Sequence, residues 1–255
     1  MKKQVMIMFL FMVCILILSG AISAENLSGN DILKKVEEAM GANTSYLNLT
    51  MTLYNSSGDS RERELEIYRK EGEKDKTFIK FLSPATIKGT AFLALEEDED
   101  SDMYLFMPAL GSERRIAGSQ KNSSFVGSDF SYNDLAIIGG GNYTSDYKSE
   151  SLEFSNEIYK LKLLPIDEDI EYKYVFMWIN ADKWYPTKME FYNSDEKLQK
   201  VLTTGTVYED NDYLIFEDIT MEDLEKGSKT KIVLNNVTFE LELDDNIFTV
   251  RHLKR

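Results

Sequence analysis

Most of the chain alternates apolar and polar residues with a period of two, the pattern of half-buried β-strands. Between Leu47 and Leu53 every second residue is apolar, and the residues between them are Asn or Thr. Similar runs recur to the end of the chain, in IYKLKLLP, YKYVFMWIN and TKIVLNNVTFELEL. This spacing predicts about a dozen strands in antiparallel sheets. A sheet this long must curl or split, and we expect it to curl around its apolar face as one domain over residues 25–255.

Two short stretches have the signals of helices instead. SGNDILKKVEEAMGA carries an apolar stripe at helical spacing, with Asn30 as the expected N-cap and Gly41 as the stop. The run Ser131–Asp134 is a variant of the capping box and predicts a second, short helix that ends at the glycines 139–141. The predicted class is therefore α+β, mainly β with a few short helices.

The first residues have the composition of an export signal. Lys2 and Lys3 precede an apolar run from Val5 to Leu18, and small residues follow up to Ala24. This order predicts a signal peptide over residues 1–24. The apolar stretch extends almost to Ile22, so an uncleaved membrane anchor is the open alternative. Both interpretations place the rest of the chain outside the cytoplasm, in a periplasm or cell envelope.

Composition narrows the function classes. The single cysteine, Cys14, lies in the export signal, so the remaining chain has no disulfide and no thiol chemistry. The formal net charge of −15 repels nucleic acid. The single histidine, His252, lies in a basic tail, where we expect it to be solvated. Catalytic triads and catalytic zinc sites usually need an imidazole, so the composition disfavours both kinds of site.

The remaining polar motifs do not indicate a cofactor. The acidic run from Glu96 to Asp102 lacks the ligand spacing of a calcium loop and reads as a hairpin tip. The glycines at 139–141 follow a predicted helix and do not open one, so they form no phosphate loop. We expect no enzyme, no cofactor and no metal, although counting carboxylates does not exclude a glycosidase. We also expect a monomer.

Four blocks of the sequence resemble a known family. FLSPATIKGTAFLAL, YLFMPALGSERRIAGSQKNSSFVGSDFSYNDL, MWINADKWYPTKMEFYN and NNVTFELELDDNIFTVRHLKR resemble successive blocks of the LolA-like outer-membrane lipoprotein-sorting proteins, in their broader and mostly uncharacterised branch. The resemblance implies an incomplete β-barrel whose apolar concave face is covered by short helices and holds lipid acyl chains. The apolar side chains on the strands have two interpretations, a filled core or a trough for such chains.

The carrier hypothesis assigns a role to each part of the central stretch. The lid segment, residues 124–141, covers the trough and moves on the glycines 118, 127 and 139–141. The expected lipid-binding residues are Leu49, Met51, Leu53, Phe92, Tyr104, Phe106, Phe125, Phe130, Tyr132, Leu135, Ile138, Trp178, Phe191 and Phe216.

Arg114 and Arg115 have two interpretations. One of them latches the closed lid to Asp129 or meets a lipid head group, or both are solvent-facing charges at a strand end. In LolA an arginine is tied to lid closure, but it lies earlier, on a different strand, so the resemblance does not transfer that role to either residue.

The leading hypothesis is a non-enzymatic carrier or binder of lipid or lipoprotein acyl chains, which could work with a membrane-embedded transporter complex. Alternatives are an envelope sensor or regulatory module, and an accessory protein of a lipid-exporting membrane transporter.

Overall fold

The computed structural model describes residues 27–96, 101–138 and 143–255. The predicted signal segment, residues 1–24, lies outside this range. Within the described residues, no helix is both long and apolar enough to span a membrane. The strands are β1 (Thr44–Tyr54), β2 (Ser60–Lys70), β3 (Lys76–Ser83), β4 (Ala91–Glu96), β5 (Ser101–Met107), β6 (Ser112–Ile116), β7 (Tyr147–Ser155), β8 (Ile158–Pro165), β9 (Tyr174–Asn180), β10 (Tyr185–Tyr192), β11 (Leu198–Thr204), β12 (Val207–Asp210), β13 (Tyr213–Phe216), β14 (Asp218–Asp223) and β15 (Ser228–Phe239). The helices are α2 (Gly29–Met40), α3 (Tyr132–Ile138) and α4 (Tyr143–Asp146), with 3-10 turns η2 (Gly118–Asn122), η3 (Phe125–Gly127), η4 (Asp245–Phe248) and η5 (His252–Lys254).

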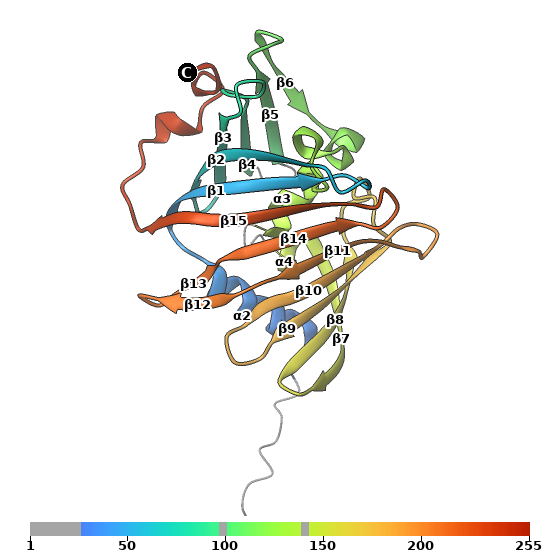
Figure 1. Cartoon of the computed structure of the whole chain (residues 1–255). Coiled ribbons are helices and arrows are strands. Elements are labelled where there is room, and N and C mark those ends of the chain that lie inside the picture. Colours follow the sequence, from blue (N-terminus) through green and yellow to red (C-terminus); the bar gives the residue numbers. More distant parts are fainter. Residues whose placement is uncertain (1–26, 97–100, 139–142) are drawn as a thin grey trace, which may run out of the picture.

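One antiparallel 13-stranded sheet forms the body of the molecule, in the order β6-β5-β4-β3-β2-β1-β15-β14-β11-β10-β9-β8-β7. The sheet curls but does not close, because its two edge strands, β6 and β7, do not pair with each other (Figure 1). The prediction of a curled antiparallel sheet in a mainly β fold is confirmed.

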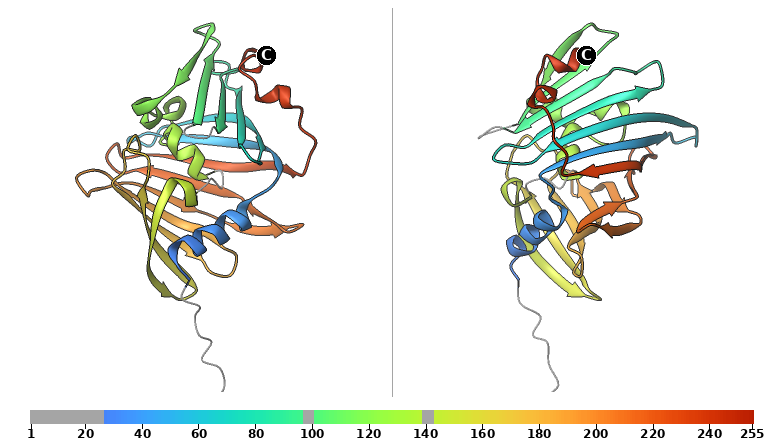
Figure 2. Two further views of the ribbon diagram at one scale, coloured as in Figure 1. Left: turned by 180° about the vertical axis from the view of Figure 1, so that it is seen from behind. Right: turned by 90° about the vertical axis from the view of Figure 1, so that its left-hand side faces the viewer.

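The helices of the central stretch cover the open side because of this topology. Residues 117–146 connect one edge strand, β6, to the other, β7, and must therefore cross the opening. Figure 2 shows α3, α4 and α2 on the concave side of the sheet. The predicted covering of the concave face by short helices thus follows directly from the chain order.

Capping accounts for the ends of both predicted helices. Ser28, and not Asn30 as predicted, caps α2, because the Ser28 hydroxyl accepts from Asp31 N while the Asp31 carboxylate accepts from Ser28 N. At α3 the predicted capping box forms: Ser131 N donates to Asp134 Oδ2 at 2.7 Å, and Asp134 N donates to Ser131 Oγ at 3.1 Å.

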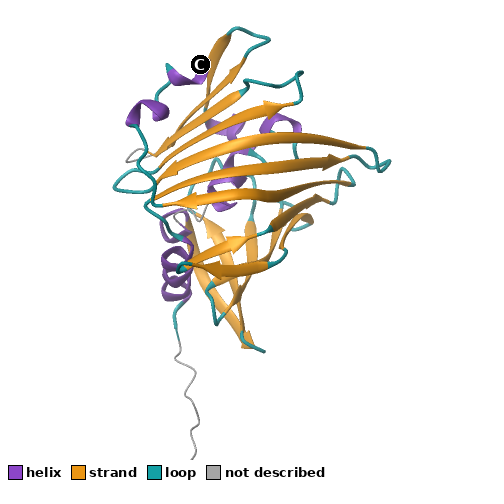
Figure 3. Cartoon of the chain, turned by 60° about the vertical axis from the view of Figure 1, so that its left-hand side comes forward, coloured by secondary structure: helices purple, strands orange, loops and turns teal. Residues whose placement is uncertain are grey.

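A second apolar layer lies on the convex face of the sheet. Phe248 and Leu253 of the C-terminal segment pack against Phe78 and Leu93 of β3 and β4. The backbone of this segment lies beside that part of the sheet (Figure 3). His252 belongs to this layer: its ring lies 5.1 Å from the ring of Phe78, and burial lowers the pKa of the imidazole. The expectation of a solvated tail histidine is therefore wrong.

Candidate functional site

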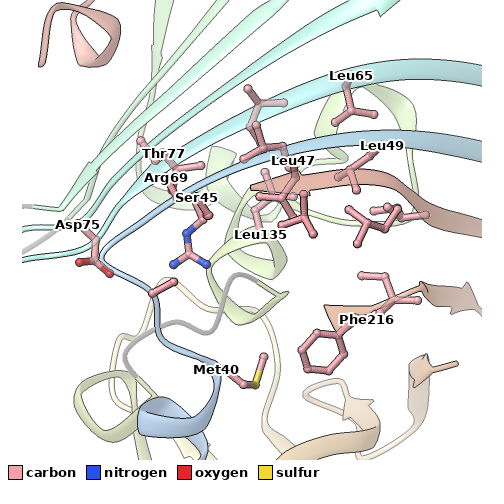
Figure 4. Close-up of a pocket in the computed structure, with 18 of the residues that line it drawn as sticks. Met40, Ser45, Leu47, Leu49, Leu65, Arg69, Asp75, Thr77, Leu135 and Phe216 are labelled. Atoms are coloured by element: carbon pink, nitrogen blue, oxygen red, sulfur yellow. The ribbon is translucent and has the colours of Figure 1, made fainter. Parts of the chain in front are cut away.

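The concave side of the sheet encloses a cavity of about 320 Å³. Strands from both halves of the sheet form its walls, and α2, α4, the lid segment and the β12–β13 hairpin cover it (Figure 4). Its apolar lining is Met40, Leu47, Leu49, Met51, Leu65, Ile67, Ile79, Phe92, Ala94, Met103, Phe125, Leu135, Pro186, Met189, Leu202, Leu214, Ile215, Phe216, Ile219, Ile232, Leu234, Val237 and Phe239. The cavity volume falls in the lower part of the range of about 300–1,000 Å³ that is typical of ligand pockets.

Strand register explains why the wall is apolar. Leu47 on β1 lies opposite Ile67 on β2, and Ile67 lies opposite Ile79 on β3, which in turn lies opposite Phe92 on β4. Side chains alternate between the two faces of a strand, so this row of apolar residues points to one side of the sheet. The period-two pattern of the sequence therefore produces the cavity wall directly.

Two residues further along each strand, at the next inward position, the same wall becomes polar. Ser45 lies opposite Arg69, and Arg69 lies opposite Thr77. Figure 4 shows these three side chains grouped at one end of the cavity, with Asp75 at its edge. Glu71, Glu96 and Asp146 also line the cavity. We call Arg69, Glu71, Asp75, Glu96 and Asp146 the charged end.

Two carboxylates of the charged end, Asp146 and Glu71, are held where burial disfavours their charged form. Burial, with a smaller contribution from the charge of Glu96, raises the pKa of Asp146 to about 6. Burial also raises the pKa of Glu71, which Arg69 partly offsets across a 3.5 Å ion pair. Glu71 Oε2 accepts from Ala42 N at 3.0 Å. These shifts indicate negative charge that the protein only partly compensates.

Three side chains of the lid segment close the cavity from the open side of the sheet. Phe125, Tyr132 and Leu135 line it, and Phe125 and Tyr132 form an aromatic cluster with Phe92 on β4, with ring centroids 5.4 to 5.6 Å apart. The predicted inward orientation of these residues is thus observed. The side chain of Ile138 and residues 139–142 lie outside the described part of the chain.

Buried polar contacts hold the lid segment in place. Lys200 Nζ on β11 lies 3.0 Å from Asp134 Oδ2 at the start of α3, and both side chains are at most 5% exposed. The hydroxyl of Tyr172 completes the network by donating to Asp134 Oδ1 at 2.9 Å and accepting from Lys200 Nζ. Arg63 on β2 donates to the carbonyl of Val126 at 2.7 Å.

The predicted latch between an arginine and Asp129 does not form. Asp129 is buried and accepts instead from the hydroxyls of Ser228 and Thr230 on β15, the latter at 2.6 Å. Arg115 pairs with Asp102 on the neighbouring strand β5. Arg114 lies beside Tyr132, where its hydrogen bond and charge partly offset the burial that raises the pKa of that hydroxyl. The lid segment is therefore held by other partners.

The predicted lipid-binding residues separate into three groups. Seven of them line the cavity: Leu49, Met51, Phe92, Phe125, Tyr132, Leu135 and Phe216. Leu53, Phe130 and Phe191 belong to the core inside the sheet but do not line the cavity. Tyr104, Phe106 and Trp178 lie on the convex face, so their assignment to the cavity is wrong.

Strand alternation gives the reason for these three corrections. Met103 and Leu105 are the buried, inward residues of β5, which turns Tyr104 and Phe106 toward the C-terminal segment. On β9 the inward residues are Val175, Met177 and Ile179. On the outer side of β9, the ammonium groups of Lys160 and Lys188 lie over the ring of Trp178, at 4.9 and 4.3 Å from its centroid.

Two parts of the site were largely missed. The β12–β13 hairpin pairs only with itself, yet Leu214 and Ile215, which were not predicted, extend from it into the cavity beside the predicted Phe216. The charged end was also missed, although the inward row of β2, Leu65–Ile67–Arg69, already shows an arginine continuing an apolar face. In the described part of the chain, no three His, Cys, Asp or Glu side chains are grouped so that they could hold a metal ion.

A family model described as "Uncharacterized protein" matches residues 73–255. The chain belongs to this family. No curated protein matches the sequence. Among solved structures, a domain from Vibrio parahaemolyticus, described as an outer membrane lipoprotein-sorting protein domain, is 27% identical with a TM-score of 0.82, over 89% of this chain and 98% of that one.

Two further structures share the fold. A DUF1329 family protein from Desulfovibrio piger is 23% identical with a TM-score of 0.82, over 88% of this chain and 97% of that one. A LolA superfamily protein from Nitrosomonas europaea is 23% identical with a TM-score of 0.71, over 89% of this chain and 99% of that one. The LolA-like resemblance is confirmed, and the fold is LolA-like.

Proposed function

We propose that this LolA-like protein is a non-enzymatic, extracytoplasmic carrier or binder of lipid or lipoprotein acyl chains. The observation that carries the proposal is the cavity of about 320 Å³ with its apolar wall. Burying one CH₂ group is worth about 0.8 kcal/mol, so a 16-carbon chain gains roughly 12 kcal/mol on leaving water. A covered apolar cavity provides a place for such a chain in an aqueous compartment.

Two further observations support the proposal. The domain from Vibrio parahaemolyticus, which is described as lipoprotein-sorting, matches over nearly its whole length. The order of charged, apolar and small residues over positions 1–24 is typical of an export signal. The lid segment and the β12–β13 hairpin both cover the cavity. An acyl chain can therefore enter only if one of these two covers opens.

Native mass spectrometry of the purified protein, followed by lipid extraction, tests the proposal. We expect co-purified acyl species and saturable binding of Nile red, a neutral apolar dye. Ala94→Phe places a ring inside the cavity and should abolish both, whereas Ala85→Phe, at an exposed loop position, should change neither. Native protein that carries no acyl species and binds no dye would overturn the proposal.

A further inference from the structure

The wall of the sheet is incomplete beside the last part of β15. On one side of this strand, β1 pairs with it over residues 229–239. On the other side, β14 pairs with it only over residues 228–233, because the chain before Asp218 leaves the sheet as the β12–β13 hairpin. Among the described strands, none pairs with residues 234–239 of β15 on that side. We call the line along which these residues face the hairpin the seam.

Few contacts hold the seam closed. At one end of it, Leu234 N donates to the carbonyl of Glu217 at 2.8 Å. At the other end, the ring of Tyr213 stacks on Phe239, with centroids 4.3 Å apart, and the Tyr213 hydroxyl donates to Glu240 Oε1 at 3.0 Å. Between these two ends, no backbone hydrogen bond between described residues crosses the seam. Side-chain contacts, and not a strand ladder, therefore close most of it.

A second cleft, of about 470 Å³, lies on the outer side of the seam, and we call it the outer cleft. Asn236 lines it and lies opposite Asn48 on β1. Asn48 follows Leu47, which faces the apolar cavity, so Asn48 and Asn236 face the convex side. The residues that line both the outer cleft and the apolar cavity are Ile215, Asp218, Leu234 and Val237. One layer of residues at the seam thus separates the two spaces.

The outer cleft can both donate and accept hydrogen bonds. Tyr208, Glu217 and Asn236 line it, and their side chains form no hydrogen bond with other described residues, so their polar atoms are available to a ligand. The lysine of the cleft, Lys231, is already paired with Asp218 at 3.1 Å. A hydroxyl group matches this set because it donates and accepts at once, whereas an ammonium group only donates and a phosphate group mainly accepts.

From this arrangement we infer that the outer cleft is a second binding subsite, which holds an uncharged, hydroxyl-rich head group such as a sugar. The chain of the same lipid passes through the seam, between Ile215, Leu234 and Val237, into the apolar cavity. The inference rests on the proposed function, because it assigns the head group of the ligand whose chain that cavity binds. The exposed ring of Tyr208 offers an apolar surface to the C–H face of a sugar.

Competition against Nile red with three amphiphiles of equal chain length tests the class of head group. The probes are dodecyl maltoside, dodecyltrimethylammonium and dodecanoate at neutral pH, all below their micelle concentrations. We expect the native protein to bind the maltoside at least about tenfold more tightly than either charged probe. Dodecanoate should bind weakly because Asp210 and Glu217 repel an anion at the outer cleft.

Matched variants separate the outer cleft from the rest of the surface. Tyr208→Ala with Glu217→Ala removes two exposed side chains of the cleft that do not line the apolar cavity. Phe154→Ala with Glu153→Ala removes an equivalent exposed pair on β7, outside both spaces. The first pair should weaken maltoside binding about tenfold and leave Nile red affinity unchanged. The second pair should change neither, and circular dichroism checks that both variants fold.

Cysteine protection tests whether the head group lies in the outer cleft. In a chain with Cys14→Ser, Asn236→Cys places a thiol in the cleft, and Ser155→Cys places one at an exposed position on β7. Dodecyl maltoside should slow alkylation of the first thiol by a maleimide and leave the second unaffected. Maltose alone, which lacks the chain, should protect neither thiol at the same concentration.

The outcomes are distinct. Equal binding of the three probes, tighter binding of a charged probe, an unchanged preference in the cleft variant, or no protection of the thiol at position 236 overturns the inference. In each of these cases, saturable Nile red binding leaves the carrier proposal standing. If the dye does not bind and no probe binds, the proposed function fails together with the inference.

Discussion

At the scale of single residues, Lys200 has the largest expected effect on stability. Its ammonium group is the cation that faces Asp134, whose side chain is completely buried. Lys200→Met leaves that carboxylate buried without its partner, so the free energy of unfolding should fall by about 3–5 kcal/mol. Urea denaturation measures the change. Lys197→Met, at an exposed position, should stay within about 0.5 kcal/mol of the native protein, and equal effects would refute the assignment.

Asp146 gives a stability prediction that depends on pH. Its pKa is raised from 3.8 to about 6 in the folded protein, so the folded state binds more protons than the unfolded state between these values. Stability is therefore lost as the pH rises through this window. Asp146→Asn should remove that loss and stabilise the protein at pH 7 by about 1–3 kcal/mol, the lower value allowing for partial exposure.

Thermal melting from pH 4 to pH 7.5 measures the effect of Asp146→Asn. The native and variant curves should converge at the acid end and separate toward neutral pH. Glu153→Gln, an exposed carboxylate, serves as the control and should leave the pH profile unchanged. Parallel native and Asp146→Asn curves would show that this carboxyl group does not titrate in the folded protein as described.

At the scale of elements, short sequence patterns predicted the features that depend only on neighbouring residues. The alternation from Leu47 to Leu53 gave β1, and Ser131 with Asp134 gave the capping box of α3, because both depend on neighbouring residues only. The cap of α2 was misplaced by two residues, since Asn30 and Ser28 are both good caps and only the contact with Asp31 distinguishes them. Long-range partners such as Lys200 could not be predicted, because nothing in one sequence pairs it with Asp134.

The two covers of the cavity differ in how they are held. The lid segment has a buried ion pair and buried hydrogen bonds to β11 and β15. The β12–β13 hairpin lies outside the large sheet and is held by contacts such as the stacking of Tyr213 on Phe239, with ring centroids 4.3 Å apart. Segments with fewer buried contacts open at lower free energy. This comparison favours the hairpin, and not the lid segment, as the part that opens.

Cross-linking tests which cover moves, in a chain freed of its one cysteine by Cys14→Ser. Joining Tyr213→Cys to Phe239→Cys with a short bifunctional maleimide should slow the release of Nile red about tenfold. Joining Asp129→Cys to Ser228→Cys, whose native side chains are hydrogen-bonded, should change release little. The reverse result would show that the lid segment opens.

At the scale of the whole molecule, the sheet has two apolar faces with different roles. The sequence shows that Tyr104 and Phe106 alternate with Met103 and Leu105, but alternation alone does not say which set faces the concave side. The C-terminal segment decides this, because Phe248 and Leu253 cover the face that carries Tyr104 and Phe106. That contact joins positions over 140 residues apart in the chain, so no local pattern could have predicted it.

Because the two faces are separate, stability and binding should respond to different substitutions. Phe248→Ala removes a buried ring from the convex layer and should lower the free energy of unfolding by about 3–5 kcal/mol, with Nile red affinity unchanged in the folded protein. Phe92→Ala removes a buried ring from the cavity wall and should lower stability by a similar amount while also altering dye affinity. Urea denaturation and dye titration on the same samples give both quantities. If Phe248→Ala weakened dye binding as much as Phe92→Ala, the convex layer would be coupled to the cavity, and the sheet could not be acting as a rigid wall between them.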